Sequence, residues 1–315
     1  KAEFLYQYQE TNGYSFRSKM FANNAKYNKL GSIFPSLTNF ITNTNFSKKV
    51  LGVAAERTVP KLSKQTLNNW LKKRVVTSSA VEKPFKKSVY LFNDEFTNFY
   101  DTEIGKDAVI LLEKLGYEIK IVKHDESGRS HISKGFLKEA KAICNNNVSV
   151  FKDLITEQTP LIGIEPSAIL TFKDEYIRLA DDKTSAEKIA KNSFTFEEFL
   201  AIELEKGNID TSLFTEDSKT LKIHGHCHQK ALTGTHASFQ VLNIPKNYSV
   251  TIMNTGCCGM AGSFGYEKEH YKVSMQVGED TLFPKVRNCS SDTEIAAAGT
   301  SCRHQIFDGT KRIAK

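Results

Sequence analysis

Two adjacent cysteines, Cys257 and Cys258, are the residues of this chain whose types and spacing point most clearly to chemistry. They lie in a glycine-rich turn, between Gly256 and Gly259, directly after the apolar run 248–253. Glycine tolerates positive φ, so we expect this turn to bend and to present both thiols to one pocket. Adjacent thiols on such a bend are suited to holding a metal.

Two further cysteines occupy similar positions at long range. Cys227 follows the expected strand 221–224, and Cys302 follows the expected strand 295–298. In a parallel sheet, ligands gather outside the carboxyl ends of the strands. We therefore predict one shared pocket whose metal ligands are Cys227, Cys257, Cys258 and Cys302. Four thiolates suffice for an iron–sulfur cluster or for zinc.

The cysteine pattern alone also allows two arrangements without a metal. The cysteines could be buried or unpaired thiols, or Cys257 and Cys258 could form a strained vicinal disulfide. Cys144 and Cys289 lie outside the cluster, and Cys144, in the helix-like run 138–144, is predicted to be a buried core thiol. Thiols clustered at turns of a chain with an ample core do not indicate a secreted disulfide scaffold. We expect a cytoplasmic setting, with peripheral membrane association left open.

Three histidines surround Cys227. If the run 224–228 is extended, His224, His226 and His228 share one face and Cys227 points to the other. The histidines then do not join Cys227 around one metal unless the strand ends before them. They could support the ligands by hydrogen bonds, face a flavin or partner domain, or be structural.

Composition indicates a soluble globular protein long enough for two domains, with 315 residues, 40% hydrophobic and 25% charged. No apolar run approaches the roughly 20 residues needed to span a membrane, so we expect no transmembrane segment. The chain does not begin with Met and opens in a helix-like run. A piece cut from a longer protein therefore fits this beginning better than processing does.

The net charge of +7 is uneven along the chain. Residues 1–88 carry 16 Lys and Arg against 4 Asp and Glu, whereas the remaining residues carry 27 against 32. Such a basic segment could contact nucleic acid, a membrane surface or an acidic partner domain, or it could be a solvated face. Its basic residues are dispersed and match no nucleic-acid-binding module, so we expect no nucleic-acid partner.

Strand and helix signals alternate from Ser88 onward, and this alternation predicts parallel sheets with helices on both faces. Val75 to Lys87 resembles a polar linker. The expected strands are 89–92, 117–122, 161–164, 221–224, 248–253 and 295–298. The expected helices are 106–115, 133–144, 169–179, 231–242, 267–282 and a last one running to the end.

The two halves of this region are a repeat. Shifting the second half by 131 positions places Tyr248 on Tyr117, Cys257 on Glu126, Cys258 on Ser127 and Gly259 on Gly128. A shift of 134 places Cys302 on Ala168, and Cys227 corresponds to the region of Asn93 and Asp94. The first half keeps the backbone scheme but lacks the thiols, so the metal site is predicted in the second half alone.

The order Cys227, Cys257-Cys258-Gly259, Cys302 resembles the cysteine-rich "CCG" domain over about residues 88–315. That domain occurs in heterodisulfide reductase B subunits, glycolate oxidase iron–sulfur subunits, anaerobic glycerol-3-phosphate dehydrogenase C subunits and lactate-utilisation proteins. The fullest form ends in CxxC, whereas here Gln305 stands at the last position. The resemblance therefore implies one conventional four-thiolate 4Fe–4S cluster rather than a double cluster. The residues expected to line the cofactor are Gly256, Gly259, His226, His228 and Gln305.

The segment before the repeat extends the resemblance. Residues 52–57, Val59-Pro60, Thr66 and Trp70 are similar to the linker that follows a ferredoxin-like domain in FAD-linked D-lactate-dehydrogenase-like oxidoreductases. The first half, with residues 128–130 and 133–135, fits the same group. The resemblance implies that FAD and ferredoxin-like domains, on the same or a partner chain, are the partners of this one. The electron acceptor is not indicated.

We thus expect an α/β protein with two repeated Rossmann-like parallel-sheet halves related by pseudo-two-fold symmetry, after a mainly helical or irregular N-terminal segment. The expected parts are residues 1–87, a first half 88–180, a helical connector 181–220 and a second half 221–315. The expected function is an iron–sulfur electron-transfer module of a FAD-dependent 2-hydroxyacid oxidoreductase, with no catalytic residue of its own. The alternatives are a structural zinc module and a partner-docking module.

Overall fold

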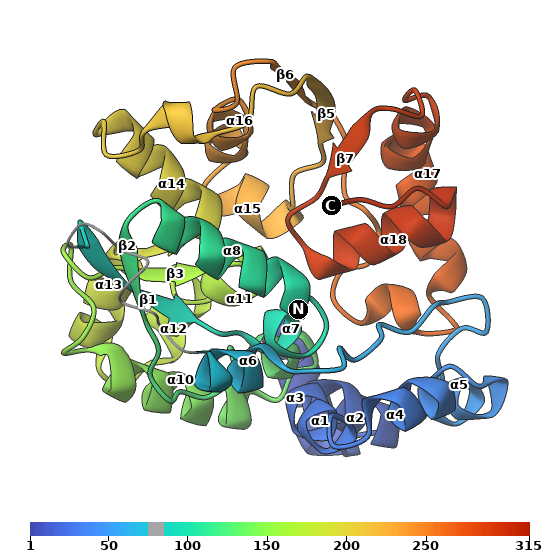
Figure 1. The fold of residues 1–315 in the computed structure, drawn as a ribbon. Coiled ribbons are helices and arrows are strands. Elements are labelled where there is room, and N and C mark those ends of the chain that lie inside the picture. The colour runs from blue at the N-terminus through green and yellow to red at the C-terminus, as the bar shows by residue number, and fades with distance from the viewer. Residues whose placement is uncertain (75–84) are drawn as a thin grey trace. The chain divides into compact units, whose positions relative to one another are not determined.

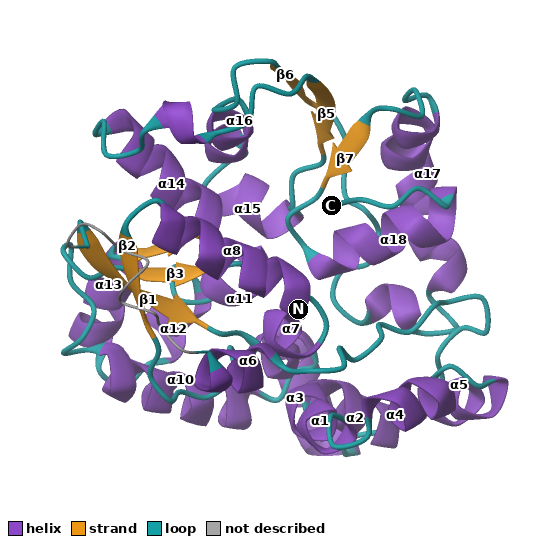
Figure 2. Cartoon of the chain, in the orientation of Figure 1, coloured by secondary structure: helices purple, strands orange, loops and turns teal. Residues whose placement is uncertain are grey.

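The computed structural model describes residues 1–74 and 85–315, so the predicted polar linker 75–87 lies largely outside the described residues. These residues form two compact units, each discontinuous in sequence. The first comprises residues 1–42 and 61–195, and the second comprises residues 43–60 and 196–315. Each unit is built around its own parallel sheet (Figures 1 and 2).

The described part of the first unit contains a four-stranded sheet in the order β2-β1-β3-β4, with every pairing parallel. Its strands are β1 (Lys87–Phe92), β2 (Tyr117–Lys120), β3 (Leu161–Gly163) and β4 (Ser193–Thr195). The first three lie where the sequence predicts strands. β4 lies in a stretch for which only helix is expected, because its three residues are too few to show a periodicity among polar neighbours.

Helices cover this sheet and form the N-terminal part of the unit (Figure 1). The N-terminal ones are α1 (Ala2–Asn12), α2 (Phe16–Ala22), α3 (Asn24–Gly31), α4 (Pro35–Thr42) and α6 (Leu67–Lys73). Those of the sheet region are α7 (Glu95–Phe99), α8 (Thr102–Lys114), α9 (Arg129–Ser133), α10 (Leu137–Phe151), α11 (Pro166–Ile169), α12 (Glu175–Leu179) and α13 (Lys183–Lys191). Helix α8 packs against β2, whereas α10 packs against α12 and α13. Phe92, Phe151 and Phe172 meet edge to face in the core.

The second unit contains a three-stranded parallel sheet in the order β6-β5-β7. Its strands are β5 (Lys219–Ile223), β6 (Tyr248–Ile252) and β7 (Glu294–Ala296). Its helices are α5 (Asn45–Leu51), α14 (Phe196–Glu205), α15 (Cys227–Leu232), α16 (His236–Leu242), α17 (Tyr271–Arg287) and α18 (Thr300–Thr310), with 3₁₀ turns at Thr211–Leu213 and Phe264–Tyr266. The last helix does not run to the end as predicted, because Ala314 pairs alongside Ile295 of β7.

Two helices that the sequence predicts as single are each divided by a glycine with positive φ. Gly135 (φ 75°) separates α9 from α10, and Gly234 (φ 73°) separates α15 from α16. Only glycine adopts this conformation without strain, so a helix ends there. The predicted helix 169–179 is likewise divided, by a turn between α11 and α12.

The α/β class and the two parallel-sheet halves are confirmed, and so is the common scheme of the halves. The order β2-β1-β3 of the first unit matches β6-β5-β7 of the second. Lys87 pairs with Tyr117 just as Lys219 pairs with Tyr248. This register makes Glu95, rather than Asn93 or Asp94, the counterpart of Cys227. Within residues 1–74 and 85–315, none of the helices has both the length and the apolarity that a membrane crossing needs.

Candidate metal centre

The carboxyl ends of the three strands in the second unit carry the four predicted ligands. Cys227 is the first residue of α15 after β5, and Cys302 lies in the first turn of α18 after β7. Cys257 and Cys258 lie in the turn that follows β6. The parallel strands end at one edge of the sheet, so side chains remote in sequence meet there.

The four thiols interact with one another at one edge of the sheet. The Sγ atoms of Cys302 and Cys258 are 3.7 Å apart. Cys257 is linked to both Cys227 and Cys258 by its influence on their pKa values. All four are free thiols, so the vicinal disulfide is not formed. Cys258 and Cys302 are buried, whereas Cys227 and Cys257 are half-buried. Cys144, outside the cluster, is a buried core thiol as predicted.

The thiols shift one another's pKa values in opposite directions. The neighbouring thiol of Cys227 lowers the pKa of Cys257, and that of Cys258 lowers the pKa of Cys302. The same contacts, together with burial, raise the pKa of Cys227 and Cys258. The thiolate is the form that binds a metal, so Cys257 and Cys302 are the thiols most readily available as ligands.

His224 belongs to this site, although the sequence does not single it out as a lining residue. The strand ends at Ile223, so the extended arrangement considered for 224–228 is wrong. His224 is fully buried, and a ring nitrogen lies within 4.8 Å of the Sγ atoms of Cys258 and Cys302. The one signal for it in the sequence is its place directly at the end of an apolar strand.

The glycines of the turn differ in importance. Gly259 has φ 95°, and a Cβ atom there would lie 2.2 Å from the carbonyl oxygen of Ser274. Its amide donates to the Cys257 sulfur at 3.3 Å. Gly256 does not have a positive φ, and its amide donates to the Thr281 hydroxyl at 2.8 Å. Only Gly259 is required by the bend.

The two predicted histidines lie at the start of α15. His226 caps this helix, because its Nδ1 accepts the amide N–H of His228 at 3.3 Å. A positive charge on His226 would lower the pKa of Cys302, so His226 is electrostatically coupled to the thiols. The ring of His226 also packs against Gly299, where a Cβ would lie 2.5 Å away. His228 is half-buried.

Gln305 lies about one turn after Cys302 on α18 and is fully buried. Its Nε2 donates to the Ser274 carbonyl at 3.0 Å. A Cβ atom on Gly259 would lie 3.1 Å from the same nitrogen, its nearest contact after the Ser274 oxygen. Its Oε1 accepts from Arg57 at 2.5 Å. The amide of Gln305 therefore supports the back of the cysteine turn.

Arg57 is itself fully buried in the second unit. Beyond Gln305, its guanidinium donates to the Gly265 carbonyl at 2.6 Å and the Ser274 hydroxyl at 2.7 Å, and it pairs with Asp308 at 3.2 Å. A buried cation is stable only when its donors are paired, and these contacts pair them. The segment 43–60 is thus fastened into the unit that carries the thiols.

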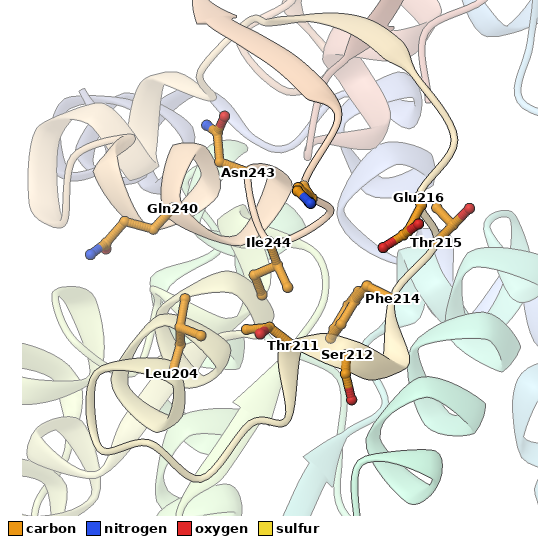
Figure 3. A pocket seen from close by; sticks show the side chains of 10 residues that line it. Leu204, Thr211, Ser212, Phe214, Thr215, Glu216, Gln240, Asn243 and Ile244 are labelled. Carbon is orange, nitrogen blue, oxygen red and sulfur yellow. The ribbon is translucent and has the colours of Figure 1, made fainter.

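A hollow of about 540 Å³ lies elsewhere in the second unit, between α14, α16 and the turn 211–216 (Figure 3). Leu204, Phe214 and Ile244 line it, and Gln240 extends away from it. The described residues of its lining include neither cysteine nor histidine. The hollow is therefore separate from the candidate metal centre.

The known proteins to which this chain is similar include a dehydrogenase, a dehydrogenase subunit and a lactate utilization protein. The chain is 24% identical to D-2-hydroxyglutarate dehydrogenase of Escherichia coli K12 over 318 aligned positions, which cover 97% of the chain and 30% of that protein. It is 25% identical to the anaerobic glycerol-3-phosphate dehydrogenase C subunit of the same organism, over 88% of the chain and 70% of that relative. It is 24% identical to lactate utilization protein A 1 of Bacillus mycoides, covering 59% and 80%.

No family model matches the chain. The chain spans less than a third of the length of the D-2-hydroxyglutarate dehydrogenases, 27% of the Pantoea ananatis protein and 30% of the E. coli protein. The chain is therefore similar to parts of oxidoreductases that differ in length, because it covers 30% of one relative and 70% of another.

Proposed function

We propose that this chain is an iron–sulfur electron-transfer module of a FAD-dependent 2-hydroxyacid oxidoreductase. The observation that carries the proposal is the chain of four thiols that the strand ends bring together in the second unit. Soft thiolates select iron–sulfur clusters and zinc over hard cations. Two of the relatives are a dehydrogenase and a dehydrogenase subunit, which favours a redox group.

The proposed ligands of a 4Fe–4S cluster are Cys227, Cys257, Cys258 and Cys302, as in the CCG-type domains that the cysteine pattern resembles. The residues fit such a group, because Cys258 and Cys302 meet in an apolar core that contains Met260 and Ile306, and Cys227 and Cys257 lie beside them at the same strand ends. A bound cluster supplies one-electron transfer. The chain's own residues orient the cluster, exclude water from its inner side and set its potential.

Oxidation of the substrate is assigned to a flavin outside this chain. The chain matches less than a third of the D-2-hydroxyglutarate dehydrogenases, which leaves ample length there for flavin and ferredoxin-like domains. Exposed aromatic side chains of α1 and α4, such as Phe4 and Phe40, are typical of a surface that another domain covers. We place the protein in the cytoplasm, where thiols stay reduced.

A structural zinc site is the second candidate. The observation in its favour is His224, because mixed cysteine and histidine sets are common around structural zinc. Zinc would stabilise the second unit without a redox role.

Metal analysis of the chain purified without oxygen separates the two candidates. We expect about four irons and four sulfides per chain and a brown protein absorbing at about 400 nm. The matched control is a variant with all four cysteines replaced by serine, which should be colourless. One zinc per chain, with neither iron nor sulfide, would reject the electron-transfer function.

A further inference from the structure

We propose that Lys230 is a positioning residue of the metal centre, which joins the turn 254–259 to α15 and supplies a positive charge beside the thiols. This turn, the cysteine turn, carries Cys257 and Cys258. The inference rests on the proposed function, because it names a residue that supports and tunes the same centre. Lys230 itself binds no metal, so the four ligand positions remain with the cysteines.

Two hydrogen bonds of the lysine cross the outer side of the site. Lys230 lies about one turn after Cys227 on α15. Its Nζ donates to the carbonyl oxygens of Thr255 and Gly256, each at 2.9 Å. These carbonyls directly precede Cys257 in the chain. One ammonium group therefore joins the helix that begins with one proposed ligand to the turn that carries the next.

The outer side of the site is where such bonds matter most. Cys258 and Cys302 are packed in the apolar core. Cys227 and Cys257 are half-buried, and Lys230 is exposed. An exposed lysine gives up side-chain entropy when it holds one position, and hydrogen bonds from a charged donor offset that loss. Lys230 therefore fixes the pair of ligands that core packing fixes least.

The charge of Lys230 acts on the ligands as well. The neighbouring thiol of Cys257 and burial raise the pKa of Cys227, whereas the charge of Lys230 lowers it. The ammonium group is thus close enough to favour the thiolate, the form that binds a metal. Four thiolates make the centre anionic, and reduction by the flavin adds one further negative charge. Because a nearby cation stabilises the reduced form more than the oxidised form, Lys230 raises the midpoint potential.

The test compares variants of the whole chain, loaded with cluster without oxygen. Lys230→Met keeps the length of the side chain, whose stem packs beside Gly225, but loses the hydrogen bonds and the charge. We expect loss of iron to a chelator to become about 10-fold faster or more, as for other residues that support metal ligands. The midpoint potential should fall. Lys230→Arg keeps the charge, so its potential should stay near that of the wild type.

The matched control is Lys246→Met. Lys246 is an exposed lysine of the same unit that lines the hollow separate from the metal centre, so iron loss and potential should match the wild type. Because Lys230 is exposed, its variants are expected to fold, and circular dichroism checks this. A lysine with a purely structural role would not move the potential through its charge.

The outcomes separate this inference from the proposed function. Wild-type iron loss and potential in Lys230→Met would overturn the inference and leave the proposed function standing. A potential that falls as far in Lys230→Arg as in Lys230→Met would refute the role of the charge. A wild-type chain that binds zinc instead of iron and sulfide would reject the proposed function. Zinc release as slow in Lys230→Met as in the wild type would then overturn the positioning role too.

Discussion

The two units share a backbone conformation at the carboxyl ends of their strands, but the side chains at these positions differ. Where the second unit has Cys227, Cys257 and Cys258, the first has Glu95, Glu126 and Ser127. The glycines that follow, Gly128 at φ 71° and Gly259 at φ 95°, both have left-handed backbone. The frame is therefore common, and only the side chains at the strand ends differ.

Hydrogen bonds satisfy much of the first unit's set internally. The two carboxylate oxygens of Glu95 accept the hydroxyl of Ser127 at 2.7 Å and its amide at 2.9 Å. The counterpart of Cys302 is Ala168, a buried residue of the apolar core. At the strand ends of the first unit, carboxylate oxygens therefore accept from N–H and O–H groups, whereas those of the second unit offer sulfur atoms, which are weaker hydrogen-bond partners and better ligands for a soft metal.

Removal of one buried thiol should give the largest difference between the units. In Cys302→Ser we expect metal affinity to fall by on the order of 100-fold or more, because even residues behind the ligands contribute 10–100-fold. Ala168→Cys, at the matching position of the first unit, should leave iron per chain unchanged. Iron and sulfide assays check both, and equal losses in the two variants would contradict a site confined to the second unit.

The two left-handed glycines give the next largest contrast. In Gly259→Ala the new Cβ would lie 2.2 Å from a backbone oxygen, so we expect a loss of about 3 kcal/mol or more in the free energy of unfolding. In Gly128→Ala the nearest atom lies 3.5 Å away, in the side chain of Ile143. Only the cost of positive φ remains there, about 1–2 kcal/mol. Urea unfolding monitored by circular dichroism compares the two, and the ranking fails if Gly128→Ala is the more damaging.

A smaller difference between the units is expected in how their stability depends on pH. Burial, and then the charge of Glu95, raises the pKa of Glu126 to about 9, well above its unfolded value. The folded chain then binds a proton that the unfolded chain has lost, so stability falls as pH rises from about 4.5 to 9. Glu126→Gln should flatten this decline.

Trp70, the single tryptophan, lies in the first unit and provides the measurement. Its fluorescence gives the urea midpoint at pH 5 and at pH 8. A wild-type midpoint that does not fall between these values, or one that falls equally in Glu126→Gln, would show that Glu126 is not the group responsible.

The smallest effect is expected at Gly256. A Cβ there would meet only the Thr281 hydroxyl, at 3.4 Å, and the backbone does not have positive φ. We expect Gly256→Ala to change the free energy of unfolding by no more than about 0.5 kcal/mol. Thermal unfolding beside Gly259→Ala checks this. A loss as large as that of Gly259→Ala would mean that both glycines, not one, set the turn.

Much of the strand and turn structure common to the two units could be predicted, because hydrophobic runs and turn residues specify it locally. The repeat in the sequence aligns Gly128 with Gly259 and Ser127 with Cys258, and the strand registers agree. Predictions failed where a few residues decide the structure. A single glycine, Gly234, ends a helix that apolar spacing alone extends through it.

The place of His224 could not be predicted for a related reason. Whether a side chain points to the core or to the strand edge depends on the last hydrogen-bonded residue of the strand, here Ile223. Side-chain alternation does not reveal that residue. The hydrogen bond between Arg57 and Gln305 could not be predicted either, because it joins residues 248 positions apart and leaves no periodic signal in the sequence.

The burial of Arg57 has a consequence for the order in which the protein is made. During synthesis Arg57 leaves the ribosome long before Ser274, Gln305 and Asp308, which later surround it. Until then its charge must remain hydrated, so the second unit is completed only when the last helix has emerged. A fragment beginning at residue 196 would contain every thiol of the site yet leave the partners of Arg57 without their cation. Adding residues 43–60 as a separate peptide should then restore the buried cation to this fragment.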